Sequence, residues 1–158
     1  MKIKFTLLLC PFFFLACQNR LPQLSSPDGE LTVRFRLTSA GAPEYSLSRG
    51  SDSVLLWSAM GLETEEKSLN SNFSLQSVSH DRQDITWETV WGEERLIRDN
   101  HCSMMVKLRH QTGLRMNIEF RCYDDGIAFR YIFPSLKGNM TITDELTSYR
   151  FAENNEIW

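Results

Sequence analysis

The sequence predicts an all-β fold, an antiparallel β-sandwich of two packed sheets. Apolar and polar residues alternate in several stretches, two of these stretches mirror one another about a short loop, and no stretch shows a helical stripe. The best helical candidate, residues 63–69, is short and heavily charged. With 158 residues, 42% of them hydrophobic, the chain can bury one core, and a single sandwich would use most of its length.

The first predicted hairpin spans residues 31–47. Its strands are separated by the stretch 39–43, Ser-Ala-Gly-Ala-Pro, which is rich in turn-forming residues. Alternate side chains of a strand point to the same face, so the apolar residues of each strand share one face. These apolar positions are Leu31, Val33, Phe35, Leu37, Tyr45 and Leu47.

Three further apolar clusters predict strands, and Gly, Asn, Asp and Ser punctuate the gaps between them. The clusters are residues 54–57, residues 73–78 and residues 85–91. They contain Trp57, Trp87 and Trp91. Exposed tryptophans would form a platform for sugar rings, but core packing is the commoner use of a tryptophan in or beside a strand.

The clearest unit is a hairpin between residues 102 and 122. If the strands pair about residue 112, Leu108 lies opposite Met116, and each further pair on that face is also apolar. These pairs are Val106 with Ile118, Met104 with Phe120, and Cys102 with Cys122. Residues 111–113 form the loop, and Gly113 stands where a three-residue hairpin loop needs a left-handed residue. A slip of one residue would turn the whole apolar face to water, so the register is well specified.

This register predicts that Cys102 and Cys122 are directly opposed. They could form a cross-strand disulfide if the pair is a non-hydrogen-bonded one and the protein meets oxidising conditions. The alternative is two buried free thiols that pack as small apolar groups. A zinc site is disfavoured, because the three histidines are scattered and leave a tetrahedral ligand set incomplete.

The first seventeen residues have the layout of an export signal. Lys2 and Lys4 precede an uncharged run, residues 5–16, which is too short to span a bilayer as a stable helix. The run ends in Phe-Leu-Ala-Cys, which resembles the lipobox of bacterial lipoproteins and makes Cys17 the predicted lipidation site. Phe14 is unusual for that motif, so plain signal-peptidase cleavage is the alternative. Residues 18–26 are then a polar tether, and the sandwich domain spans residues 27–158.

The charge of the chain disfavours nucleic acid as a partner. The formal net charge is -3, and cleavage before Cys17 would remove two lysines and no acids, which gives -5. The remaining arginines mostly alternate with apolar residues, as on solvated strand faces. No basic stripe is left to bind phosphates.

Acidic residues are the only candidates for catalysis, because the chain has no Gly-rich phosphate loop, HExxH or CxxC motif. Asp124 and Asp125 are adjacent, so on a strand they would point to opposite faces and could not flank one glycosidic bond. We interpret Asp124-Asp125-Gly126 as a structural turn, with the carboxylates accepting backbone N–H bonds and Gly126 supplying a positive φ. A calcium site is the minor alternative. The pairs Glu93–Glu94 and Asp144–Glu145 have the same ambiguity.

Four blocks, in order, resemble the N-terminal domain of glycoside hydrolase family 97. They are SPDGELTVRF (26–35), VWGEERLIRDN (90–100), FRCYDDGIAFRYIFP (120–134) and ITDELTSYRFA (142–152). The resemblance implies a β-supersandwich similar to the galactose mutarotase fold, followed in the family by a catalytic (β/α)₈ barrel and a small β domain. Family members are exported α-glucosidases and α-galactosidases. Together with the leader, this implies a periplasmic protein or an outer-membrane lipoprotein of a Gram-negative bacterium.

In the family, the catalytic acids and most calcium ligands come from the barrel, while the N-terminal domain supports the barrel and shapes the edge of its sugar site. This chain stops at Trp158, which predicts an incomplete sandwich without catalytic residues or a cofactor. We transfer no calcium ligand to Glu145, and calcium is expected only in a full-length member. The expected partners are a catalytic-barrel chain and an α-linked oligosaccharide, with membrane contact only through the lipid.

Two other functions remain open at this point. The chain could be a stand-alone carbohydrate-binding lipoprotein, which an exposed aromatic row would favour. It could also be an enzyme of the mutarotase type, which uses a His and Glu pair, but the sequence suggests no pairing of His80, His101 or His110 with an acid.

Overall fold

The computed structural model describes residues 20–153, and within them the regular elements are eleven β-strands. All pairings between these strands are antiparallel. The first sheet has the order β1-β2-β3-β4, formed by β1 (Gln23–Ser25), β2 (Leu31–Leu37), β3 (Pro43–Arg49) and β4 (Asp52–Ala59). The second sheet has the order β10-β9-β8-β7, formed by β7 (Phe73–Glu88), β8 (Leu96–His110), β9 (Arg115–Cys122) and β10 (Ile127–Ile132). The small third sheet, β11-β5-β6, contains β5 (Leu62–Thr64), β6 (Ser68–Leu69) and β11 (Ile142–Glu145).

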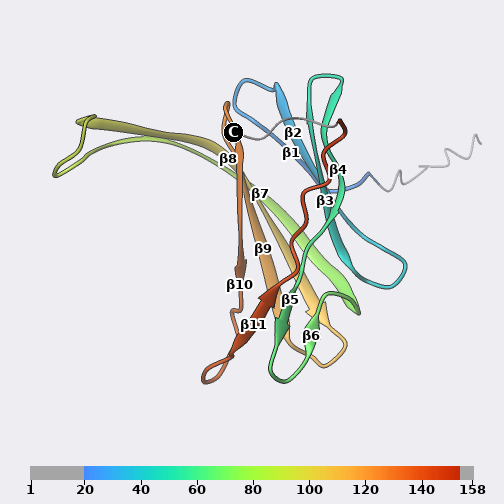
Figure 1. Ribbon diagram of the computed structural model, residues 1–158. Coiled ribbons are helices and arrows are strands. Elements are labelled where there is room, and N and C mark those ends of the chain that lie inside the picture. The colour runs from blue at the N-terminus through green and yellow to red at the C-terminus, as the bar shows by residue number, and fades with distance from the viewer. Residues whose placement is uncertain (1–19, 154–158) are drawn as a thin grey trace, which may run out of the picture.

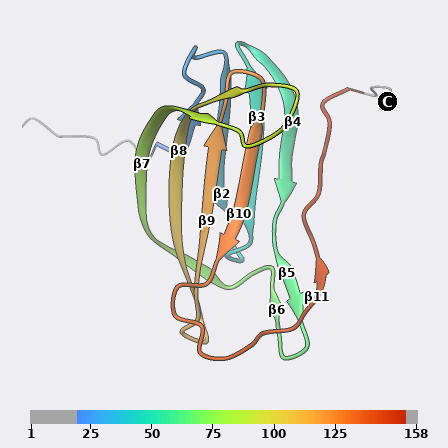
Figure 2. The ribbon, with the colours of Figure 1, turned by 90° about the vertical axis from the view of Figure 1, so that its left-hand side faces the viewer.

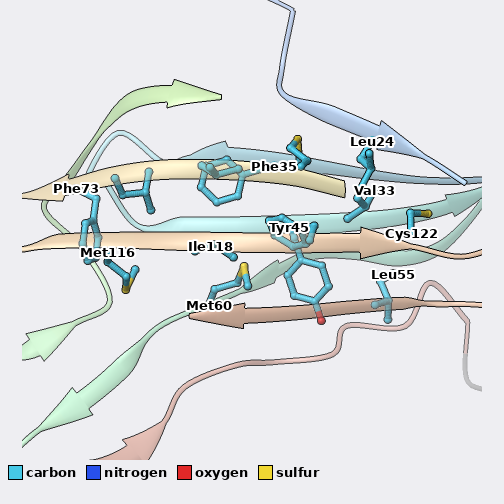
Figure 3. Close-up of a cluster of buried hydrophobic side chains, with 14 of the residues drawn as sticks. Leu24, Val33, Phe35, Tyr45, Leu55, Met60, Phe73, Met116, Ile118 and Cys122 are labelled. Carbon is cyan, nitrogen blue, oxygen red and sulfur yellow. The ribbon is translucent and has the colours of Figure 1, made fainter. Parts of the chain in front are cut away.

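The first and second sheets pack face to face and enclose one apolar core (Figures 1 and 3). Aromatic rings join the sheets at its centre: Phe120 of β9 lies 6.2 Å from Phe35 and 6.4 Å from Tyr45 between ring centroids. Tilted ring pairs at such distances are favourable beyond the area that they bury. The predicted antiparallel sandwich is thus confirmed.

Both predicted hairpins are present. In the β2–β3 hairpin, Leu31, Val33 and Phe35 are buried on one face, and Phe35 pairs with Tyr45. In the β8–β9 hairpin, the observed pairs of the apolar face are the four that the sequence predicts, from Leu108–Met116 to Cys102–Cys122. The loop closes through a His110 N–H bond to the Leu114 carbonyl at 2.8 Å, and Gly113 has φ of 90°. The alternation of side chains therefore sets both registers correctly.

The chain enters the sandwich earlier than the sequence indicates. Residues 18–26 were expected to be a polar tether, but Gln23–Ser25 form β1, which pairs with β2. Leu24 is buried in the core, because its partner position Val33 lies on the core-facing side of β2. One apolar residue among polar neighbours gave too little alternation to indicate a strand. The predicted signal sequence and Cys17 lie outside the described residues.

A long arm extends from one end of the sandwich. The distal parts of β7 and β8 and the turn between them, residues 83–101, form this arm, which curves away from the other strands (Figures 1 and 2). Trp87 is 51% exposed on the arm and Trp91 is 90% exposed at its tip. The expectation that these two tryptophans pack in the core is therefore wrong: Trp87 lies on the part of β7 that continues beyond the opposing sheet, and Trp91 lies in the turn between β7 and β8. No helix of residues 20–153 is long and apolar enough to cross a membrane.

Candidate functional site

The Asp124-Asp125-Gly126 stretch lies in the short connection between β9 and β10. Tyr123 N–H donates to the Gly126 carbonyl at 2.8 Å and closes the turn. Asp124 Oδ1 accepts the backbone N–H of Asp28 at 2.9 Å, which joins this turn to the loop between β1 and β2 in the opposite sheet. The positive φ expected at Gly126 is a correction: Gly126 is not among the glycines with positive φ, because a turn with two central residues places Asp124 and Asp125 at its corner.

Asp124 and Asp125 are both exposed at the corner of this turn. Neither of them lines the two clefts beside β10. In the neighbouring loop, the Ser26 hydroxyl and the Glu30 backbone N–H hold the pKa of Asp28 below its usual value. Residues 20–153 contain no group of three or more His, Cys, Asp or Glu side chains that could hold a metal ion. We therefore assign no calcium ligand to Asp124 or Asp125.

The other acidic pairs are also spread over the surface. Glu93 and Glu94 lie at the exposed tip of the arm, and Asp144 and Glu145 lie on the exposed strand β11. Glu145 accepts a hydrogen bond from the Thr147 hydroxyl at 2.7 Å. These positions place the pairs at different ends of the molecule, because β11 belongs to the small third sheet.

The cysteines are opposed as predicted, but they are free thiols. The His110–Leu114 hydrogen bond fixes the parity of the ladder, because hydrogen-bonded pairs recur at every second residue. Cys102 and Cys122 therefore occupy a hydrogen-bonded pair, whose side chains are farther apart than those of a non-hydrogen-bonded pair. A disulfide needs Cβ atoms only about 3.5–4.5 Å apart, so this parity disfavours the bond. Burial raises the pKa of Cys122 to about 12, which makes its thiol unreactive.

A histidine–aspartate pair that the sequence did not reveal lies on the outer face of the second sheet, at the base of the arm. His101 Nδ1 is 2.6 Å from Asp99 Oδ1, and Gln83 Nε2 donates to Asp99 Oδ2 at 2.5 Å. The Tyr123 ring covers His101, with 5.0 Å between ring centroids. Burial raises the pKa of Asp99, but the His101 contact and the Gln83 bond outweigh it and leave that pKa below its usual value.

The spacing Asp-x-His is the sequence feature that could have indicated this pair, because residues i and i+2 of a strand share a face. The arrangement differs from a mutarotase-type His and Glu pair in a sandwich cleft. His101 is buried at 3% exposure on the outer side of the sheet, where it is held between Asp99 and Tyr123. Its cross-strand partner is Gln83, so the network ties β7 to β8. We interpret it as a structural anchor of the arm.

Two clefts lie beside β10. The smaller, about 190 Å³, contains Glu119, whose carboxylate contacts the guanidinium groups of Arg121 and Arg130. The larger, about 420 Å³, lies between β10 and residues 145–149 and is lined mainly by aromatic and apolar side chains with Glu145. Hydrolysis of a glycoside uses two carboxyl groups on opposite sides of the scissile bond. Each of these clefts contains one carboxylate, so neither supplies that pair.

In the larger cleft, two tyrosine hydroxyls are engaged with the backbone. Tyr45 donates to the Ser148 carbonyl at 3.1 Å, and Tyr131 accepts the Gly61 N–H at 2.9 Å. Burial raises the pKa of Tyr45 to about 12 and also raises the pKa of Tyr131. Both phenols therefore stay neutral at physiological pH. Tyr45 holds the C-terminal segment through Ser148, and Tyr131 does so through Thr147, whose Oγ1 lies 3.2 Å from the Tyr131 hydroxyl.

Comparison with known proteins identifies relatives of the whole sandwich. The family model described as glycosyl-hydrolase 97 N-terminal matches residues 24–158. A probable retaining alpha-galactosidase of Streptomyces bingchenggensis (strain BCW-1) is 26% identical over 138 residues, which are 85% of this chain and 21% of that protein.

Solved structures agree with this match. A glycoside hydrolase family 97 enzyme from Pseudoalteromonas sp. strain K8, solved with panose and with acarbose, is 27% identical at a TM-score of 0.76. A beta-arabinopyranosidase is 25% identical at the same TM-score. The chain is covered to 83% and 84% in these comparisons but spans only about a fifth of each enzyme. Because the family model matches nearly the whole described sandwich, the chain belongs to the glycosyl-hydrolase 97 N-terminal family.

Proposed function

We propose that this chain is a non-catalytic β-sandwich module of a family 97 type α-glycosidase, which supports a catalytic barrel and shapes the edge of its sugar site. The observation that carries the proposal is the extent of the match: almost the entire chain corresponds to about one fifth of each related enzyme. Each of the two clefts beside β10 contains one carboxyl group, Glu119 or Glu145.

The test is reconstitution of activity. Residues 18–158 are assayed with α-glucosides and α-galactosides alone, and then with the Pseudoalteromonas enzyme from which the matching N-terminal segment has been removed. We expect no hydrolysis by the chain alone and a gain in hydrolysis when the two are combined. Hydrolysis by the chain alone, or an activity of the shortened enzyme that the chain leaves unchanged, would overturn the proposal.

A second candidate function is carbohydrate binding by the isolated chain, and the exposure of Trp87 and Trp91 favours it. Panose and acarbose, which occur in structures of the Pseudoalteromonas enzyme, are suitable probes. Isothermal titration would show binding that Trp91→Ser removes if the arm is a sugar platform. If sugar injected into the protein gives the same heat as sugar injected into buffer, this function is excluded for these ligands.

We also propose that the chain is exported and lipidated at Cys17, as its leader suggests. The test is growth of the producing bacterium with labelled palmitate. The wild-type chain should carry the label, and Cys17→Ala should lack it. Plain signal-peptidase cleavage would instead give an unlabelled wild-type protein with a free mature N-terminus.

A further inference from the structure

The arm, residues 83–101, is a two-stranded ribbon with two chemically different faces. Its pairing runs without irregularity from Gln83–His101 to Glu88–Leu96, so directly opposed residues share a face. One face carries Ile85, Trp87 and Ile97, and Trp87 is paired with Ile97. Ile85 and Trp87 are each 51% exposed, and within residues 20–153 no other strand covers them.

The opposite face of the arm is suited to water. It carries Asp84, Thr86 and Arg98, and the Arg98 guanidinium forms a bidentate ion pair with Asp84 at 2.8 and 2.7 Å. Leu96 is the apolar exception on this face, at 61% exposure beside Glu88. The arm therefore has the polarity of a ribbon that is solvated on one side and covered on the other.

The apolar face is a local feature of the arm. The same face of the second sheet continues over the sandwich, where it is mainly polar. Its residues there include Ser103, Lys107 and Arg109 of β8 and Arg115, Asn117, Glu119 and Arg121 of β9. Met105 is the apolar exception on this part of β8. Neighbouring exposed apolar side chains gather on the arm, and such a patch marks an interaction site.

The base of the arm is held rigidly. Gln83 and His101 are cross-strand partners, and both contact Asp99, which lies opposite Ile85. Tyr123, beyond the end of β9, packs against the His101 ring. A ribbon fixed in this way loses little freedom when it binds, which favours association through a preformed surface.

We propose that the apolar face of the arm, formed by Ile85, Trp87 and Ile97, docks on the part of a family 97 enzyme that lies outside the segment matched by this chain. This inference rests on the proposed function. The occupant follows from the comparisons, because the matched enzymes contain about four-fifths of their length beyond the segment that this chain covers. The large aromatic side chain between two aliphatic ones is the kind of anchor that dominates protein interfaces.

The experiment measures binding of residues 18–158 to the Pseudoalteromonas enzyme from which its matching segment has been removed. The variants Trp87→Ser and Ile85→Ser alter the apolar face, and Leu96→Ser is the matched control, because it removes an exposed aliphatic group from the opposite face of the same arm. Far-ultraviolet circular dichroism of each variant verifies that the fold is kept, as expected for exposed positions.

We expect Trp87→Ser to raise the Kd by about tenfold or more and Ile85→Ser to raise it by less, with Leu96→Ser close to wild type. Similar losses for both faces, or no loss for either, would overturn the docking surface and leave the proposed function standing. No association of the wild-type chain, under conditions in which the enzyme's own segment binds, would overturn both.

Discussion

Tyr45 combines the two roles of a buried tyrosine, a large apolar ring and one hydroxyl that must find a partner. Its ring packs 5.9 Å from Phe129 and 6.4 Å from Phe120, while its hydroxyl reaches the Ser148 carbonyl. The hydroxyl thus links the core of the sandwich to the segment that follows β11. Because burial disfavours the phenolate, the pKa of Tyr45 rises from 10.0 to about 12.

Tyr45→Phe should lower the free energy of unfolding at pH 8 by about 0.5–1.5 kcal/mol, because the Ser148 carbonyl loses its partner. The raised pKa also makes the wild type sensitive to alkali. The contribution of the neutral Tyr45 hydroxyl to the free energy of unfolding is complete below pH 10 and is lost as the pH rises through about 12. Urea unfolding between pH 8 and pH 12 should show a shallower alkaline decline for Tyr45→Phe than for the wild type. An equally steep decline would show that other groups cause it.

The opposed thiols of Cys102 and Cys122 give a second prediction for single residues. Their hydrogen-bonded pairing disfavours a disulfide, so the unfolded chain from residue 18 on should contain two titratable thiols after purification in air. Reductant should leave the Tm unchanged. A single transition that reductant shifts downward, together with no free thiol, would establish the cross-strand bond instead.

At the scale of elements, the two hairpin turns of the second sheet differ in what they require of their glycines. Gly113 closes β8–β9 with φ of +90°, whereas Gly126 in the β9–β10 turn has no positive φ. No heavy atom beyond the chain neighbours would lie within 4 Å of a Cβ added at either position. Any difference in stability between alanine variants at Gly113 and Gly126 therefore comes from the backbone conformation alone.

Gly113→Ala should destabilise the domain by about 1–2 kcal/mol, because an L-residue is strained in the left-handed region. Gly126→Ala should be neutral or stabilising by up to about 1 kcal/mol, because it only restricts the unfolded chain. Denaturant midpoints of the two variants measure the contrast. Equal losses at both positions would contradict the turn geometry described above.

β10 is an edge strand with little protection. The Tyr123–Gly126 bond sets the parity of β9–β10, so the backbone groups of Ile127, Phe129 and Tyr131 point away from β9. The strand has no proline, Arg130 is its only charged residue, and its register with β9 is regular. Native edge strands usually avoid this combination, because an open apolar edge pairs with other chains.

Ala128→Lys should therefore reduce self-association of the chain, since it places a charge on the exposed side of this edge. Ser103→Lys adds the same charge to an internal strand of the same sheet and serves as the control. Light scattering at increasing protein concentration should show less association for Ala128→Lys only. If both variants behave alike, net charge rather than the edge governs association.

At the scale of the whole molecule, the sequence predicted what depends on local alternation. The β2–β3 and β8–β9 hairpins follow from it, because the register of a hairpin is set by its own apolar face and turn. The arm could not be predicted in the same way. Ile85 and Trp87 alternate like core residues, and alternation indicates which side chains share a face but not whether another sheet covers that face.

The His101–Asp99 pair was missed for a related reason. Spacing places both residues on one face, but the burial of His101 depends on Tyr123, which belongs to a distant part of the sequence. The positive φ assigned to Gly126 failed because Asp-Asp-Gly is compatible with more than one turn, and backbone hydrogen bonds choose between them.

The central claim is that the module works with the rest of a family 97 enzyme, and the competing account is that the isolated chain binds sugar. Thermal unfolding of residues 18–158 tests it most directly, measured alone, with panose, and with the shortened Pseudoalteromonas enzyme. A ligand raises the Tm only if it binds the folded state. We predict that panose leaves the Tm unchanged and that the shortened enzyme raises it. A cooperative transition that panose raises by itself, with no effect of the shortened enzyme, would contradict the account.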